Sequence, residues 1–81
     1  MVNVQSPSFA RPGERVELVI LTREELAEVR ARYSDGDLKF RVVKGKDGLC
    51  RIRFVMPATE EVMFRVRDRT DGPRLVRVRA R

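Results

Sequence analysis

Histidine and tryptophan are absent from this chain, and cysteine occurs once, at Cys50. Without histidine, catalytic triads with an imidazole base and zinc sites built from cysteine and histidine are excluded. A single cysteine also excludes a disulfide within the chain. A ligand pocket of about 300 Å³ would occupy much of the core that so short a chain can build. We therefore expect neither an enzyme nor a cofactor-binding protein.

Long apolar runs are also missing. None approaches the roughly 18 residues needed to span a bilayer, so we expect no transmembrane segment. Residues 1–5 show neither the basic start nor the long apolar stretch of a signal peptide, so none is expected in this chain. The length of 81 residues fits one domain spanning 1–81, and a hydrophobic content of 42% is enough for a core.

The charged residues are unbalanced in number and in type. Lysine and arginine total 18 against 12 acidic residues, which gives a net charge of +6, and only Lys39, Lys44 and Lys46 are lysines. A basic surface attracts anions such as nucleic acids, acidic glycans, anionic lipids or an acidic protein. The alternative is that the arginines reflect genome composition or growth at high temperature and serve only as soluble surface residues.

Turn-forming residues recur about every ten positions, which is typical of an all-β sandwich or barrel. Between the turns, apolar residues occupy alternate positions in five runs: 16–20, 38–42, 50–54, 62–66 and 76–80. Successive side chains of a strand point to opposite faces, so each run has one apolar and one polar side. Cys50 falls on the apolar side of its run with Ile52 and Phe54, which favours core packing over an exposed reactive thiol.

The segment 22–33 has two interpretations. Thr22 and Glu25 have the spacing of a helix capping box, and a helix over 23–33 would gather Leu26, Val29 and Tyr33 on one side. The same residues also alternate as a strand would. We favour a short helical turn near 22–26 followed by a strand over 27–33, because the neighbouring segments are all strand-like.

Acidic residues gather at two turns. Asp35 and Asp37 flank Gly36, and Asp68 and Asp71 precede Gly72. Calcium needs six or more oxygen ligands, whereas Asp-Gly is a common hairpin turn. We therefore expect turns and no metal site.

Several short motifs follow one another in a familiar order. They are Pro12-Gly13-Glu14 before Val16-x-Leu18-x-Ile20, Val29-x-Ala31-x-Tyr33-Ser34-Asp35-Gly36, Asp47-Gly48, Phe54-Val55-Met56-Pro57, Phe64-x-Val66-x-Asp68, and Val76-x-Val78. Over nearly the whole chain this series resembles the bacterial immunoglobulin-like modules of cell-surface and secreted proteins. Two features depart from the pattern: the cysteine–tryptophan–cysteine core of antibody-type domains is absent, and Arg23-Glu24-Glu25 lengthens one loop.

The resemblance implies an immunoglobulin-like antiparallel β-sandwich of about seven strands. These strands are expected at 2–9, 14–21, 27–33, 37–43, 49–55, 61–67 and 74–80. In the common topology the third, sixth and seventh strands share one sheet and the other four form the second. The sheet with 14–21 and 49–55 then mixes charge signs, with Glu17 against Arg51 and Arg53.

The other sheet is expected to be strongly basic. Alternation and the implied strand order bring six arginines to its outer face: Arg30, Arg32, Arg65, Arg67, Arg77 and Arg79. Glu28 and Glu61 are the main residues that relieve their repulsion. Like charges on neighbouring strands cost stability, so such a face favours an acidic partner or counterions.

The resemblance implies a non-catalytic module, which is a spacer, adhesion or docking unit of a larger protein. It also favours an extracytoplasmic or cell-envelope location, with adjacent domains or an acidic protein or glycan surface as partners. The alternative is a small basic β-barrel that binds RNA or DNA through the same arginines. Such proteins usually stack bases on exposed aromatic rings, and here only Phe9 and Tyr33 are available.

Overall fold

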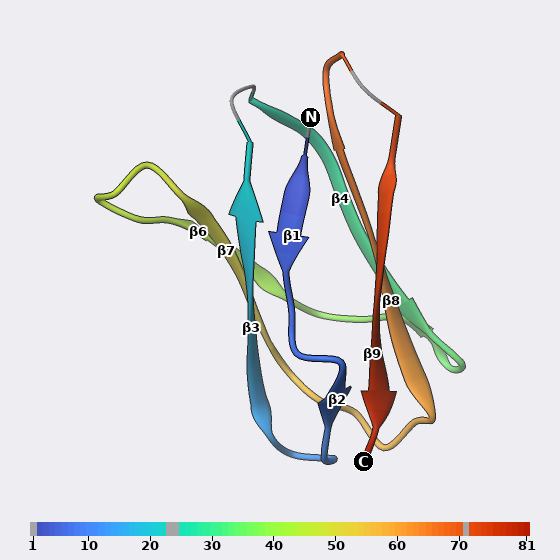
Figure 1. Cartoon of the computed structure of the whole chain (residues 1–81). Coiled ribbons are helices and arrows are strands. Elements are labelled where there is room, and N and C mark those ends of the chain that lie inside the picture. The colour runs from blue at the N-terminus through green and yellow to red at the C-terminus, as the bar shows by residue number, and fades with distance from the viewer. Residues whose placement is uncertain (1, 23–24, 71) are drawn as a thin grey trace.

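The chain is an all-β sandwich (Figure 1). The computed structural model describes residues 2–22, 25–70 and 72–81. Within these ranges it contains no helix and nine strands: β1 (Asn3–Gln5), β2 (Phe9–Ala10), β3 (Arg15–Leu21), β4 (Leu26–Tyr33), β5 (Gly36–Asp37), β6 (Arg41–Lys44), β7 (Cys50–Val55), β8 (Glu61–Asp68) and β9 (Arg74–Ala80). The all-β class predicted from alternation is therefore confirmed. No helix that could cross a membrane occurs among the described residues.

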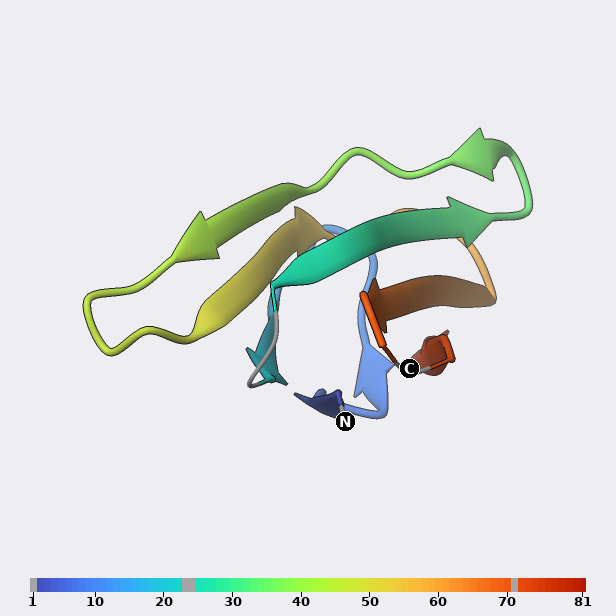
Figure 2. The ribbon, with the colours of Figure 1, turned by 90° about the horizontal axis from the view of Figure 1, so that it is seen from above.

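The strands form two sheets. One has the order β1-β3-β7-β6, and the other has the order β2-β9-β8-β4-β5. All pairings are antiparallel except that of β2 with β9, which is parallel. The strands expected at 27–33, 61–67 and 74–80 thus share a sheet as β4, β8 and β9. Figure 2 shows the hairpin of β6 and β7 projecting to one side of the sandwich.

The core lies between the sheets and is built by alternation. Val62, Phe64 and Val66 are fully buried on β8, and their neighbours along the strand point outward. Phe64 is central, because its ring centroid lies 4.9 Å from that of Phe54 and 5.9 Å from that of Phe40, which it meets edge-on. Aromatic pairs at such distances add to the stabilisation from apolar burial.

Cys50 faces the core side of β7, as its alternation predicts. It packs against the buried cluster together with Val4 and Leu38. Its position at the first residue of β7 leaves it half-buried, so its sulfur is less protected than the side chains further along the strand.

A tight turn joins β2 to β3 at the Pro12-Gly13 motif. The N–H of Glu14 donates to the carbonyl of Arg11 at 3.0 Å, and Gly13 has a φ of 85°. Proline followed by a residue with positive φ is the pattern of a type II turn, which explains the glycine. The turn is tied to the end of β7, because Gly13 donates to Met56 and Met56 donates to Glu14, both at 2.8 Å.

The single first strand predicted at 2–9 is wrong. The chain forms β1 in one sheet, breaks at residues 6–8, and then forms β2 in the other sheet beside β9. Pro7 has no N–H and a fixed φ, so it interrupts a strand ladder and lets the chain cross between the sheets.

The strand predicted at 37–43 is also two strands. β5 ends at Asp37 and pairs with β4, whereas β6 begins at Arg41 and pairs with β7 in the other sheet. Residues 38–40 cross between the sheets, and Leu38 and Phe40 pack against the core. Leu38 and Phe40 therefore alternate because the crossing segment packs on the core, and not because residues 37–43 form one continuous strand.

The helical turn proposed near 22–26 falls partly on residues 23 and 24, which lie outside the described residues. Leu26 already belongs to β4, and β4 continues to Tyr33. The strand interpretation of 27–33 is thus confirmed over the helix, and pairing with β8 explains it. β8 supplies the ladder and Val29 and Ala31 face the core.

Candidate binding face

The outer face of the sheet of β4, β8 and β9 carries all six arginines singled out from the sequence. We call this surface the arginine-rich face, and it comprises Arg30, Arg32, Arg65, Arg67, Arg77 and Arg79. Arg30 lies directly opposite Arg65, and Met63 lies between Arg32 and Arg77. These residues point outward because the intervening positions on each strand face the core.

Glu28 bridges two of these arginines. Its Oε2 atom lies 3.3 Å from Nε of Arg30, and its Oε1 atom lies 3.2 Å from Nε of Arg65. The second contact is ionic and does not have hydrogen-bond geometry. Because Arg30 and Arg65 are opposite each other in the ladder, their repulsion would otherwise destabilise the pairing of β4 with β8.

Glu61 has the same role at the other side of the sheet. Its Oε1 atom lies 3.7 Å from Nε of Arg77 and 3.6 Å from Nε of Arg79. Each of the two carboxylates is therefore shared between two guanidinium groups, so neither group of three is neutral. Exposed pairs of this kind contribute only about 0–1 kcal/mol to stability.

The cations lie further out than the anions. The four bridged arginine side chains are 52% to 73% exposed, whereas the side chains of Glu28 and Glu61 are 23% and 37% exposed. Arg32 and Arg67 make no ion pair with any residue in the described part of the chain. Asp37 lies across from Arg32 in the ladder without forming an ion pair. An approaching partner thus meets mainly guanidinium groups.

Apolar side chains interrupt the arginine-rich face. Phe9 is 52% exposed and lies across from Arg79, and Leu75 is 54% exposed and lies across from Arg65. Leu75 was not placed on this surface from the sequence. Leu75 directly precedes Val76, so it points to the face opposite that of Val76 and Val78, and this position in the alternation was the signal that the sequence offered. Exposed aromatic, aliphatic and arginine side chains together are typical of protein-binding surfaces.

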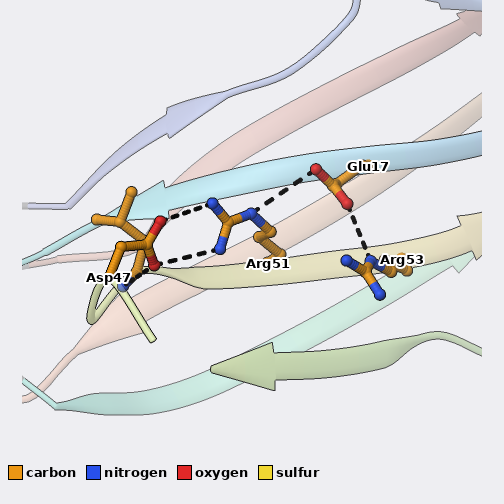
Figure 3. A network of polar contacts seen from close by, with 5 residues as sticks. Glu17, Asp47, Arg51 and Arg53 are labelled. Atoms are coloured by element: carbon orange, nitrogen blue, oxygen red, sulfur yellow. Dashed lines mark hydrogen bonds and ion pairs between the residues drawn. The ribbon is translucent and has the colours of Figure 1, made fainter. Parts of the chain in front are cut away.

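The outer face of the opposite sheet carries ion pairs of mixed sign around Arg51 and Arg53. Figure 3 shows Arg51 between two carboxylates: its Nη2 atom lies 2.8 Å from Oδ2 of Asp47, and its Nε atom lies 3.8 Å from Oε1 of Glu17. Glu17 also contacts Arg53 at 2.9 Å. The expected mixture of signs on this sheet is therefore present in its ion pairs.

The same network perturbs one acid. The hydrogen bonds from Arg51 and then from the backbone N–H of Leu49 hold the pKa of Asp47 below its usual value. Asp47 raises the pKa of Arg51 in turn. Asp47 also connects the β6–β7 turn to β7, so its charge has a structural role there.

No metal-binding cluster was found in the ranges that the structure describes, where no three His, Cys, Asp or Glu side chains come together. The arginine-rich face offers electrostatic attraction together with a few apolar contacts.

Comparison with known proteins does not assign this chain to a family. No protein-family model matches the chain, and no curated protein matches it in sequence at a significant level.

Proposed function

We propose that the chain is a non-catalytic, immunoglobulin-like interaction module whose arginine-rich face docks onto an acidic surface of a protein or glycan. In this proposal it serves as a spacer or docking unit beside other domains of a secreted or cell-envelope protein.

The strand arrangement supports the immunoglobulin-like part of the proposal. The division into β1-β3-β7-β6 and β9-β8-β4 matches the division of strands expected for such a sandwich. β1 starts at one end of the sandwich and β9 finishes at the opposite end (Figure 1), and the longest dimension of the molecule is 33 Å. Segments before and after the sandwich would leave from opposite ends, which suits a spacer.

The observation that carries the docking function is the excess of cations on one face. Two carboxylates bridge four of the six guanidinium groups there, whereas on the other sheet Arg51 and Arg53 are paired with Asp47 and Glu17. An acidic partner would relieve like-charge repulsion that the isolated chain retains. The interleaved Phe9 and Leu75 provide apolar contact area, which favours a protein surface over a simple polyanion.

The test compares two variants of equal charge. In the first, Arg65, Arg67, Arg77 and Arg79 are replaced by Gln. In the control, Arg15, Lys39, Arg41 and Lys46 are replaced by Gln, and both variants have a formal net charge of +2 instead of +6. We expect a heparin column to retain the control and to release the first variant at much lower salt. Equal elution of the two variants would refute docking by this face.

Nucleic acid binding is the alternative outcome, and the exposed ring of Phe9 beside Arg79 is the feature that favours it. Base stacking on an aromatic ring adds about 1–3 kcal/mol per base to the salt-dependent attraction of the arginines. Tight binding of a single-stranded oligonucleotide at physiological salt, lost in Phe9→Ala, would replace the module proposal.

A further inference from the structure

A surface hollow of about 740 Å³ lies at the end of the sandwich where β4 ends and β8 begins (Figure 1). Arg32, Tyr33 and Ser34 line one side of it, and residues 58–61 with Met63 line the other. Ligand sites in proteins usually have volumes of about 300–1,000 Å³. Because the walls are strand ends, a turn and a loop, a site of this size leaves the core between the sheets intact.

The two walls of the hollow are tied to each other and to β9. The hydroxyl oxygens of Ser34 and Thr59 lie 3.3 Å apart and share a hydrogen bond. The N–H of Thr59 donates to the carbonyl of Pro57 at 2.9 Å, and the N–H of Ala80 donates to the carbonyl of Glu60 at 2.8 Å. The loop is therefore held in place before a ligand arrives, which lowers the entropic cost of binding.

The polar side chains of the hollow differ in what they can bind. Arg32 makes no ion pair with a described residue, and a guanidinium group holds a carboxylate through two parallel hydrogen bonds. The hydroxyl oxygens of Ser34 and Thr59 keep the capacity to accept hydrogen bonds. Glu60 is exposed and also has no ion pair with a described residue, so its carboxylate accepts hydrogen bonds and repels a densely charged anion. These groups together fit a ligand with one carboxylate and several hydroxyls.

The apolar part of the lining comes from Tyr33, Ala58 and Met63. A few polar groups placed among apolar side chains are typical of small-molecule sites. A sugar ring has C–H groups on its faces and hydroxyls at its rim, so it can meet both parts of such a lining.

The hollow is continuous with the arginine-rich face, because Arg32 and Glu61 belong to both. Glu61 is already shared between Arg77 and Arg79, so its charge is compensated within the face. A glycan with one ring in the hollow can thus extend its neighbouring acidic groups over the arginines of β8 and β9.

We propose that this hollow binds a carboxylate-bearing sugar ring of an acidic glycan. Arg32 holds the carboxylate, and the ring hydroxyls donate hydrogen bonds to Ser34, Thr59 and Glu60. The inference rests on the proposed function and names the chemistry of the partner, since the remaining acidic groups of the glycan meet the arginine-rich face.

An acidic side chain of a protein fits the hollow less well. It offers a carboxylate to Arg32 but no hydroxyl to Glu60. The exposed Phe9 and Leu75, which favour contact with a protein, lie on β2 and β9, and β8 separates β9 from β4. A glycoprotein can therefore contact Phe9 and Leu75 with its protein part and fill the hollow with its glycan.

The first test titrates the chain at low salt with a trimer of galacturonic acid. Capped triglutamate has the same number of carboxylates without ring hydroxyls, and the methyl ester of the trimer has the hydroxyls without the charge. We expect the acid trimer to bind about tenfold more tightly than either control. Its binding should shift the amide resonances of Ser34 and Thr59 more than those of β6.

A blocking variant tests the place of binding. Ala58 is exposed and lines the hollow, so Ala58→Trp should fill the space without changing the charge. Asn3→Trp is the matched control, because Asn3 is exposed on β1 in the opposite sheet. We expect Ala58→Trp to weaken trimer binding at least about tenfold and Asn3→Trp to leave it unchanged. Both variants should bind inorganic polyphosphate like the natural chain, since polyphosphate reports only the charge of the arginine-rich face.

A second pair of variants tests the role of Arg32. Arg32→Gln and Arg67→Gln each remove one unpaired cation from the arginine-rich face, but only Arg32 lines the hollow. Polyphosphate affinity should fall to a similar extent in both variants. Trimer affinity should fall about tenfold in Arg32→Gln and much less in Arg67→Gln.

Three results would overturn the sugar site. The first is equal affinity for the acid trimer and capped triglutamate, which would assign the hollow to an acidic protein segment. The second is unchanged trimer binding in Ala58→Trp, and the third is an equal loss of trimer affinity in Arg32→Gln and Arg67→Gln. If the variant with Gln at Arg65, Arg67, Arg77 and Arg79 still loses polyphosphate binding, the docking function stands without the sugar site. If that variant binds polyphosphate like the natural chain, the docking function itself fails.

Discussion

Replacing Phe64 with Ala tests whether the core is organised around this ring. Phe64 is fully buried, and its removal takes away the contacts with Phe40 and Phe54. Truncation of a buried phenylalanine costs about 3–5 kcal/mol, as lost apolar burial and a residual cavity. A chain of this length has a free energy of unfolding of about 4–12 kcal/mol, so Phe64→Ala should remove a large part of it.

Urea unfolding followed by circular dichroism measures this effect. For a small protein the free energy of unfolding falls by about 1–3 kcal/mol per molar urea, so the midpoint should drop by at least about 1 M. Phe9→Ala is the matched control, because Phe9 is 52% exposed and its truncation should cost about 1 kcal/mol or less. Equal shifts for the two variants would show that the burial assigned to Phe64 is wrong.

Two further predictions concern Asp47 and Cys50. The lowered pKa of Asp47 stabilises the folded state above the unfolded pKa of about 3.9, and this stabilisation is lost as the pH falls through the folded-state value. Asp47→Asn should therefore lower the urea midpoint at neutral pH, and this deficit should shrink as the pH falls below about 3.9, so a deficit that stays constant with pH would contradict the assignment. Half-buried Cys50 should react with a thiol reagent measurably in the native state and faster in denaturant, and Cys50→Ser should cost about 1 kcal/mol. Identical labelling rates in both states would place Cys50 outside the core.

Most of the fold could be predicted from the sequence because alternation and turn residues are local signals. The runs around Ile52 and Phe64 have one apolar side each, and turn residues such as Gly13 mark where strands end. The outward positions of the arginines follow from the same alternation. The strand was favoured over a helix for 27–33 because the neighbouring runs are strand-like, and the pairing with β8, which no local pattern contains, confirms it.

The errors arose where the chain crosses between sheets. Leu38 and Phe40 alternate like strand residues, yet they belong to a crossing segment whose apolar side chains pack on the core. Pro7 indicated the other crossing, which separates β1 from β2. The sheet that each of these two strands joins depends on β3 and β9, which are distant in the sequence.

Amide chemical-shift mapping of an acidic probe on the natural chain tests the central claim most directly. Heparin fragments added at low salt should shift the amides of β4, β8 and β9, above all around Arg32, Arg65 and Arg77, and the shifts should vanish as salt is raised. Shifts concentrated instead on β6 and β7, where Arg51 and Arg53 are paired with carboxylates, would contradict the account.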